Sequence, residues 1–134
     1  MNIQWVDIKT VSNVSGNLSI IESGIDLPFE IRRIYYIWNT HNGLPRGSHA
    51  HKELRQAFIA VHGSCELVFN DTIEEQRFLL NDASQCLVVA PGYWRDIEKF
   101  SEDCVLMVLA SEHYDEKDYI RNYDEYIAYV REKA

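Results

Sequence analysis

The sequence predicts an all-β domain, a barrel or sandwich of short strands, that ends in one α-helix. Short apolar or alternating runs recur along the chain, and turn pairs such as His62-Gly63, Asn70-Asp71 and Asn81-Asp82 separate them. Many short strands at fairly regular spacing indicate a barrel or a sandwich. The 134 residues are 46% hydrophobic, which suits one domain, residues 1–134, with a single core.

The expected strands follow from the individual runs, taken in chain order. They are NLSIIES (17–23), IRRIYYIW (31–38), QAFIAVHG (56–63), SCELVF (64–69), QRFLL (76–80), QCLVVAP (85–91) and CVLMVLA (104–110). The end of the chain differs, because an acidic stretch, DEKD (115–118), suits a helix N-terminus and apolar residues recur at helical spacing after it. The apolar positions of this expected C-terminal helix are Tyr119, Tyr123, Tyr126, Ile127 and Val130.

The charge of the chain is unevenly distributed. The formal net charge of −8 argues against nucleic-acid binding, since affinity for a phosphate backbone comes from clustered lysine and arginine. Residues 31–56 nevertheless contain five basic residues against the single acidic Glu53. A local basic patch in an acidic protein favours an anionic small molecule as ligand. Taken alone, two of these residues are interpreted as ordinary surface charges, Arg32 and Arg55.

The compartment is expected to be the cytoplasm. No apolar run approaches the roughly 20 residues that span a bilayer, and the N-terminal stretch MNIQWVDIKT lacks the apolar region of a signal peptide. No membrane partner is therefore expected. Cys65, Cys86 and Cys104 lie in apolar runs without the short spacing of a zinc site, so they are interpreted as reduced core residues.

Two histidines one residue apart stand in the stretch RGSHAHKELRQ (46–56). Side chains alternate between the faces of a strand, so His49 and His51 point to the same side while Ala50 points to the other. Two imidazoles that face one cavity can titrate near neutral pH and move protons. The other three histidines are in loop or turn contexts and are given no functional role, namely His41, His62 and His113.

The spacing around the pair resembles the first cupin motif. Gly43, His49, His51, Gln56 and Gly63 stand at the intervals of that motif, but metal-binding cupins have a carboxylate where this chain has the neutral amide of Gln56. The second cupin motif normally offers another histidine, and this chain has Arg95 and Asp96 in that neighbourhood. An adjacent guanidinium repels a cation, so a site without metal is expected. The alternative is a metal-dependent cupin, such as an oxygenase, with His49, His51 and Asp96 as ligands.

Two separated segments extend the resemblance to nearly the whole chain. The stretch IRRIYYIWNTHNGLPRGSHAHKELRQ and the later FSEDCVLMVLASEHYDEKDYIRNYDEY resemble the nucleotide-sugar 3,4-ketoisomerases, the WxcM-like cupins that act on dTDP-4-oxo-6-deoxy-glucose. The resemblance implies a small single-domain cupin (RmlC-like jelly-roll) β-barrel and a homodimer that exchanges N-terminal strands. It also implies a reaction without metal or organic cofactor that moves a ketone from C4 to C3, ahead of transamination to a 3-amino sugar for lipopolysaccharide or an S-layer glycan.

The resemblance also implies roles for particular residues. His49 matches the catalytic base and His51 its partner, while Tyr35, Arg33, Arg46 and Arg121 match residues that line or close the sugar-nucleotide site. Arg33 and Tyr35 have the same parity in one strand, so both side chains reach the cavity if that face is inward. Guanidinium groups bind phosphate oxygens in pairs, which suits a diphosphate; Lys52 is a further candidate.

One position departs from the family pattern, and another position varies among family members. Ser15 stands where members usually have an arginine, so a substrate contact from that loop is not expected. Members have either His or Arg at the position of Arg95, close to the expected location of C4. Two other functions share these residues: epimerisation next to the ketone, and non-catalytic binding of a sugar nucleotide.

Overall fold

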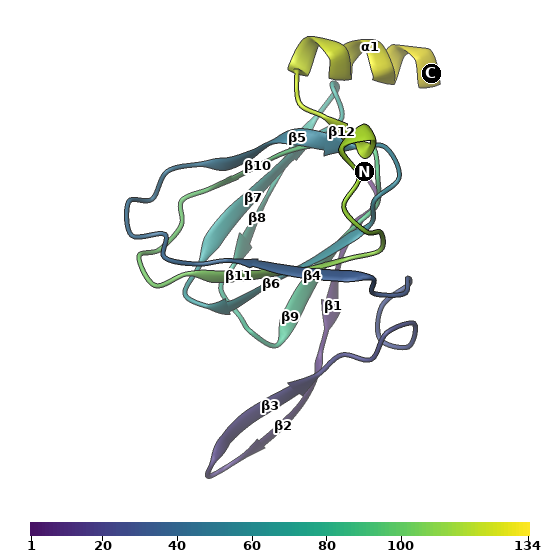
Figure 1. Cartoon of the computed structure of the whole chain (residues 1–134). Helices are drawn as coiled ribbons and strands as arrows, with labels where there is room; N and C mark the ends of the chain where they lie inside the picture. Colours follow the sequence, from purple (N-terminus) through teal and green to yellow (C-terminus); the bar gives the residue numbers. More distant parts are fainter.

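Two five-stranded antiparallel sheets face each other, and one helix lies across the outer side of the second sheet (Figure 1). The computed structural model describes residues 1–134. The first sheet has the order β1 (Ile3–Asp7), β9 (Gln85–Val89), β6 (Gln56–His62), β11 (Val105–Ala110) and β4 (Arg33–Ile37). The second has the order β12 (Tyr119–Ile120), β5 (Arg46–His51), β10 (Trp94–Glu98), β7 (Cys65–Asn70) and β8 (Glu75–Leu80). The predicted all-β architecture with a C-terminal helix is confirmed.

The main core fills the space between the two sheets. Side chains from the inner face of the first sheet, such as Phe58 and Leu106, meet Phe69 and Ile97 from the second. The sheets share no ladder of hydrogen bonds, so they form a jelly-roll sandwich in place of a continuously hydrogen-bonded cylinder. All three cysteines are free and buried, as expected from their apolar runs.

Each sheet is also covered on its outer side. Leu27 and Phe29, from the segment before β4, pack with Ile59 and Val88 on the outer face of the first sheet. On the second sheet, Ala50 and Trp94 are buried by Ile120 and by Tyr126 of the helix. Both sheets thus have apolar residues on their two faces, which explains why several runs are continuously apolar and do not alternate.

The C-terminal segment differs from the prediction at its start. Helix α1 spans Tyr123–Lys133, and the side chain of Asn122 caps it by accepting from the backbone N–H of Glu125 (3.1 Å). Tyr119, predicted to lie in this helix, is instead in β12, where it pairs with His51. The acidic stretch forms a separate 3-10 helix, η1 (Glu116–Asp118). Asn122 is the stronger cap because its short side chain reaches the free N–H groups of the first turn.

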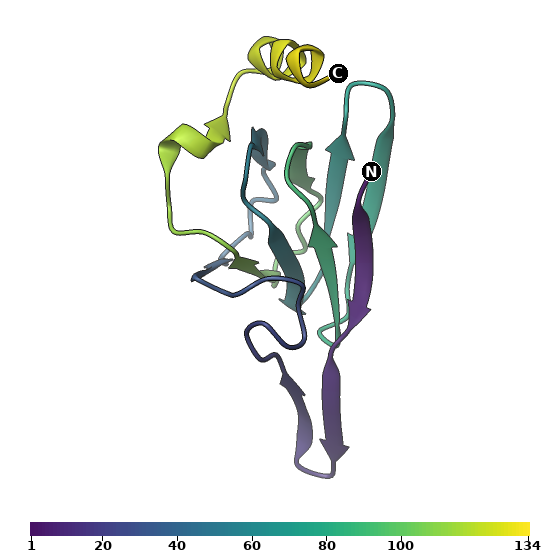
Figure 2. The same cartoon turned by 90° about the vertical axis from the view of Figure 1, so that its right-hand side faces the viewer.

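The N-terminal segment contains the expected strand over residues 17–23 as β3 (Gly16–Ile20), and two strands, β1 and β2 (Lys9–Asn13), that the apolar runs did not predict. β1 pairs with β9, and β2 and β3 form a hairpin. Figures 1 and 2 show this hairpin projecting from the body of the molecule. Every residue of its two strands is exposed. The only α-helix is too short to cross a membrane.

Replacing Tyr126 by phenylalanine should destabilise the protein by about 1–2 kcal/mol, because two partly buried carbonyls then lose a hydrogen-bond donor. The Tyr126 hydroxyl lies 2.8 Å from the carbonyl oxygen of Gly92 and 3.1 Å from that of Asn70. Urea unfolding measures the change. Tyr123→Phe is the control, because the Tyr123 hydroxyl makes one long contact of 3.2 Å at the surface. Equal midpoints for both variants would contradict the assignment.

Candidate active site

The two histidines of β5 contact each other directly. Their Nε2 atoms are 3.1 Å apart and their rings are nearly perpendicular. His51 is fully buried and His49 is partly buried, while Ala50 between them points to the opposite face and packs under the helix. Strand alternation therefore places both imidazoles on the inner face of β5 and the packing residue Ala50 on the outer face.

A local distortion of β5 fixes His49. Gly47 has φ of +95° and Ser48 has φ of +56°, and the pairing with β10 shifts register between Arg95 and Asp96. A Cβ at position 47 would lie 3.2 Å from the Arg95 carbonyl oxygen, so glycine is favoured by both conformation and space. The distortion turns the Gly47 carbonyl towards His49, whose Nδ1 lies 3.0 Å from it. A carbonyl only accepts, so His49 Nδ1 carries a proton.

His51 is held from the other side by Asp118 of η1. The Asp118 Oδ2 atom lies 2.9 Å from His51 Nδ1, and its Oδ1 accepts from the backbone N–H of Glu53 (2.7 Å). This residue was not predicted as part of the site, because DEKD was interpreted only as charge at a helix N-terminus. The two residues are 67 positions apart, and only the pairing of β12 with β5 brings them together.

A buried arginine forms the floor of the site. Arg95 is 2% exposed, lies 5.5 Å above the Phe69 ring, and donates to the carbonyl oxygen of Tyr93 (3.0 Å) and to Gln56 Oε1. Gln56 Nε2 in turn donates to the Tyr35 hydroxyl at 2.9 Å. Gln56 stands where metal-binding cupins have a carboxylate, and its amide oxygen accepts a hydrogen bond from the Arg95 guanidinium. Because Tyr35 accepts from Gln56, its own hydroxyl hydrogen remains available to a ligand.

Burial and this arginine set the protonation of the site. Burial, and then the Arg95 charge, lower the pKa of His49 from 6.5 to about 4. The same two causes, in the same order, lower the pKa of His51. Burial lowers the pKa of Arg95 only to about 10, so it is a cation at neutral pH. Burial also raises the pKa of Tyr35, which keeps the phenol protonated.

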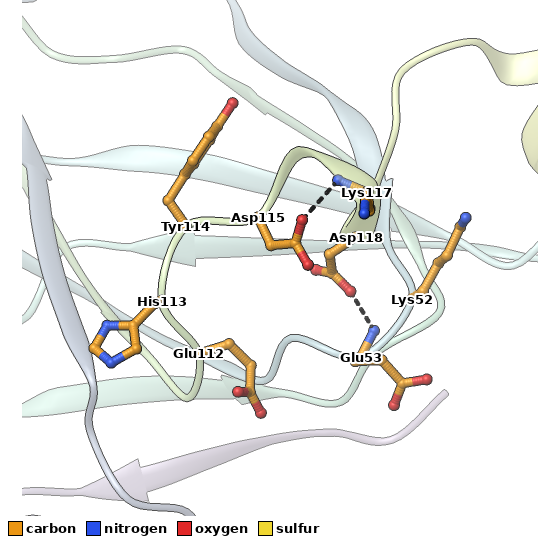
Figure 3. Close-up of a pocket in the computed structure, with 8 residues that line it drawn as sticks. All are labelled: Lys52, Glu53, Glu112, His113, Tyr114, Asp115, Lys117 and Asp118. Atoms are coloured by element: carbon orange, nitrogen blue, oxygen red, sulfur yellow. Dashed lines mark hydrogen bonds between the residues drawn. The ribbon is translucent and has the colours of Figure 1, made fainter.

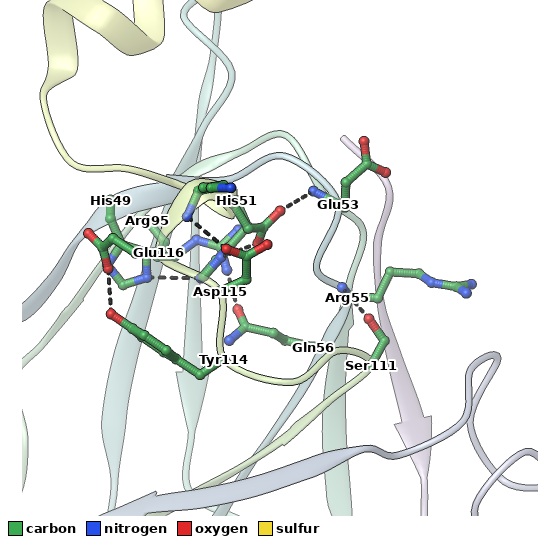
Figure 4. A network of polar contacts seen from close by, with 12 residues as sticks. His49, His51, Glu53, Arg55, Gln56, Arg95, Ser111, Tyr114, Asp115 and Glu116 are labelled. Atoms are coloured by element: carbon green, nitrogen blue, oxygen red, sulfur yellow. Dashed lines mark hydrogen bonds and ion pairs between the residues drawn. The ribbon is translucent and has the colours of Figure 1, made fainter.

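Arginine and tyrosine side chains surround the histidine pair. Arg33 shares the inner face of β4 with Tyr35, and its Nε and Nη2 atoms are buried without a hydrogen-bond partner. Tyr119 packs its ring against both imidazoles, at 5.1 Å from His49 and 4.4 Å from His51. Arg121 lies 4.2 Å above the Tyr119 ring and forms two hydrogen bonds with Glu116, at 2.6 and 3.0 Å. Figure 4 shows His49 and His51 next to each other, with Arg95 and Gln56 beside them.

Three residues named in the sequence analysis lie away from this cluster. Arg46 is exposed and lines a cavity of about 290 Å³ with the loop 37–45. Lys52 follows His51 with the opposite parity and is exposed. Asp96 accepts from Ser48 Oγ at 2.6 Å, and no three histidine, cysteine or carboxylate side chains gather as a metal site. The ligand set His49, His51 and Asp96 is therefore not assembled.

A larger pocket lies behind Asp118, outside the histidine site. It measures about 660 Å³ and contains neither imidazole (Figure 3). Acidic side chains predominate in its lining, which disfavours a diphosphate; the eight residues are Lys52, Glu53, Glu112, His113, Tyr114, Asp115, Lys117 and Asp118. Chemistry therefore favours the histidine cluster as the site, because Arg95 and Arg33 lie next to the two imidazoles there.

Comparison with known proteins agrees with this geometry. A curated protein of Aneurinibacillus thermoaerophilus, TDP-4-oxo-6-deoxy-alpha-D-glucose-3,4-oxoisomerase, is 42% identical over 130 residues, which cover 97% of this chain and 94% of the relative. The crystal structure of QdtA, a sugar 3,4-ketoisomerase from Thermoanaerobacterium thermosaccharolyticum, in complex with TDP, is 43% identical. It superposes with a TM-score of 0.95 over 98% of this chain and 96% of QdtA.

Two further structures bear on the ligand and the fold. A mutant of QdtA was solved in complex with TDP-4-keto-6-deoxyglucose; it is 42% identical with a TM-score of 0.95, and the match covers 98% of this chain and 96% of that one. The rmlC epimerase of Mycobacterium tuberculosis is 16% identical with a TM-score of 0.71, over 87% of this chain and 66% of the epimerase. This distant likeness confirms the predicted RmlC-like jelly roll alone.

The family assignment rests on nearly the whole of the chain. The model of one family, described as FdtA: WxcM-like, C-terminal, matches residues 1–131. That match and the 42% identical relative agree with the resemblance seen in the two sequence segments. The chain belongs to the FdtA family of WxcM-like proteins.

Proposed function

We propose that residues 1–134 form a nucleotide-sugar 3,4-ketoisomerase, which converts dTDP-4-oxo-6-deoxy-glucose to a dTDP-3-oxo-6-deoxy-hexose by acid/base catalysis through an enediol. The observation that carries the proposal is the contact of His49 and His51, 3.1 Å apart, next to the buried cation Arg95. The names of the relatives, a 3,4-oxoisomerase and a 3,4-ketoisomerase, support it.

The reaction needs two different proton transfers. A ketone at C4 acidifies the hydrogen on C3, so a base can remove it and give an enediol. Protonation of C4 and loss of the proton from the C3 oxygen then give the C3 ketone. We assign the carbon-bound protons to His49, whose Nε2 is free of hydrogen when Nδ1 donates to Gly47. The oxygen-bound protons are assigned to His51.

Arg95 and Tyr35 stabilise the negative charge that develops on the sugar oxygens. Arg95 is a cation in a site from which water is largely excluded, and a fixed charge acts strongly there because little solvent screens it. The Tyr35 hydroxyl accepts from Gln56 and can donate its hydrogen to the substrate. The reaction changes no net oxidation state, so this set of groups suffices without a metal or an organic cofactor.

The arginines around the pair suit the nucleotide diphosphate. The unpartnered Nε and Nη2 atoms of Arg33 are donors that a ligand would satisfy, since buried donors without partners are costly. Arg121 offers a guanidinium held above Tyr119. Arg46 and Lys52 are assigned to more exposed parts of the same ligand.

The exposed N-terminal hairpin suits a homodimer with exchanged N-terminal strands. Val11, Val14 and Leu18 of the hairpin are more than half exposed, as are Ile34 and Tyr36 on the outer side of β4. β4 is also the free edge of its sheet. A second copy that covers these apolar surfaces would remove them from water.

The product suits the synthesis of an amino sugar. A ketone at C3 is the functional group that an aminotransferase requires, so the enzyme would act ahead of transamination in making a 3-amino-3,6-dideoxy sugar for lipopolysaccharide or an S-layer glycan. The cytoplasm is the proposed compartment, in agreement with three free thiols.

An NMR time course with dTDP-4-oxo-6-deoxy-glucose in deuterated buffer containing EDTA tests the function. The wild-type protein should form the 3-oxo product and incorporate deuterium. His49→Asn should abolish exchange at C3, whereas His51→Asn should slow isomerisation but leave measurable exchange. A C3 or C5 epimer as product would indicate an epimerase. Binding without turnover would indicate a sugar-nucleotide sensor. Turnover only after a divalent metal is added would indicate a metal-dependent cupin.

The dependence of kcat/KM on pH reports the base in the free enzyme. A base acts only when unprotonated, and the pKa of His49 is lowered to about 4. The value should therefore be level from about pH 8 to about pH 6, and a decrease should begin only as the pH approaches the pKa of His49. A half-maximal value near the ordinary histidine pKa of 6.5 would contradict the assignment.

Arg33→Lys should weaken dTDP binding by about 1.5–3 kcal/mol, the typical contribution of hydrogen bonds to a charged group. Lysine keeps the charge but lacks the paired donors of a guanidinium. Isothermal titration calorimetry measures the affinity. The control is Arg32→Lys, because Arg32 is exposed and pairs with Glu112 at 3.3 Å. Equal affinities of the two variants and the wild type would remove Arg33 from the nucleotide site.

A further inference from the structure

A continuous chain of three hydrogen bonds runs through the histidine pair. It begins at the Gly47 carbonyl oxygen, 3.0 Å from His49 Nδ1, continues through the two Nε2 atoms at 3.1 Å, and ends where His51 Nδ1 lies 2.9 Å from Asp118 Oδ2. Two of its four members are imidazoles from β5, and Asp118 comes from the distant segment 112–118.

The ends of the chain determine how many protons it holds. Each of the three links needs one hydrogen. The Gly47 carbonyl cannot donate, an ionised carboxylate only accepts, and a neutral imidazole has one N–H. Two neutral rings therefore supply two hydrogens for three links. If both rings donated through Nδ1, the two Nε2 lone pairs would face each other at 3.1 Å. Filling all three links with hydrogen bonds therefore takes a third proton.

We propose that Asp118 is a positioning residue that holds this third proton on His51, so that His51 presents an acidic Nε2–H while His49 presents an unprotonated Nε2. The inference rests on the proposed function and deepens it, since it makes one imidazole the acid and its neighbour the base.

The fold fixes the Asp118 carboxylate tightly. Its Oδ1 accepts from the backbone N–H of Glu53 at 2.7 Å, and its own carbonyl accepts from the backbone N–H of Lys52 at 3.0 Å. Both donors directly follow His51 in the chain, so the carboxylate and the imidazole are anchored to the same stretch of backbone. A carboxylate held in this way fixes both the orientation and the proton of the ring.

The charges around His51 explain why a carboxylate is needed. Burial and the Arg95 cation oppose a positive imidazole at this position, and Arg33 and Arg121 act in the same direction. The Asp118 carboxylate lies in contact with the ring, and an opposite charge at hydrogen-bond distance favours the protonated imidazole against these effects. Without this carboxylate, the third proton would leave the hydrogen-bonded network at neutral pH.

The assignment gives a complete proton balance. In the first step the C3–H bond breaks towards His49 Nε2, its electron pair forms the C3=C4 bond, and the C4 oxygen takes the proton of His51 Nε2. In the second step the C3 hydroxyl returns a proton to His51 Nε2 and the C3=O bond forms. The electron pair of the C3=C4 bond then takes the proton of His49, which becomes bonded to C4. Both imidazoles end as they began, and no oxidant or reductant is used.

Asp118→Asn tests the proposal because it preserves the geometry. The amide oxygen can still accept from Glu53, and the amide nitrogen would donate to His51 Nδ1, which then carries no hydrogen. All three hydrogen bonds of the network keep a hydrogen. The hydrogen between position 118 and His51, however, then belongs to an amide nitrogen that does not release it. The matched control is Asp115→Asn, since Asp115 caps the same 3-10 helix through the N–H of Lys117 at 3.0 Å.

The first measurement uses protein with ¹⁵N-labelled histidine and needs no substrate. Both ring nitrogens of His51 should carry a proton in the wild type and in Asp115→Asn, and Nδ1 should lose its proton in Asp118→Asn. A wild-type His51 with only one protonated nitrogen would overturn the proposal. This result stands whether or not the protein turns over the 4-oxo sugar.

The second measurement uses turnover. Asp118→Asn should lower kcat by roughly 10²-fold or more, in the range expected for a lost general acid, with dTDP affinity and unfolding midpoint unchanged. Asp115→Asn should match the wild type in all three. An unchanged kcat in Asp118→Asn, or a loss of dTDP binding as large as the loss of kcat, would show a merely structural role and overturn the proposal. Absence of turnover in the wild type would instead refute the proposed function.

Discussion

The buried positive charge of Arg95 is the constraint on which the rest of the site depends. A buried charge is costly unless hydrogen bonds satisfy it, and here the donors reach the Tyr93 carbonyl and Gln56 Oε1 without a direct carboxylate partner. The positive charge is therefore not neutralised within its own contacts. It lowers the pKa of both histidines and remains available to an anion. A glutamate at position 56 would form an ion pair with Arg95 and cancel this field, so the neutral amide has a clear electrostatic purpose.

β5 carries the histidine pair and a packing residue at alternate positions. Its inward positions carry His49 and His51, and its outward Ala50 is buried with Trp94 and Tyr126. The small alanine lets the helix segment approach the strand closely. The same approach brings η1 and β12 alongside β5, which places Asp118 and Tyr119 against the imidazoles. Packing on the outer face of the strand is thus coupled to the geometry of the inner face.

The sequence could predict those parts of the site that depend on local periodicity. A period of two residues placed His49 with His51 and Arg33 with Tyr35, and the structure has both pairs on inward faces. Apolar runs likewise predicted the central strands β6, β7, β9 and β11. Strands with mixed composition were missed, including β1, β10 and β12, because their pairing depends on distant partners. Tyr119 was placed in a helix for the same reason: its helical spacing is local, whereas its pairing with His51 is not.

Contacts with residues distant in the sequence also make the two histidines different from each other, so that one can act as the acid and the other as the base. Two identical imidazoles on one strand have no intrinsic difference, and burial lowers the pKa of both. The difference arises at the Nδ1 atoms. Nδ1 of His49 contacts the neutral Gly47 carbonyl, whereas Nδ1 of His51 contacts the Asp118 carboxylate. A carbonyl stabilises a neutral ring with a free Nε2, whereas a carboxylate stabilises a protonated ring. An isomerase must remove a proton from carbon and supply one to oxygen in the same step, and then reverse both. A symmetric pair would lack that division, so the asymmetry of the two partners is the feature that suits this scaffold to the reaction.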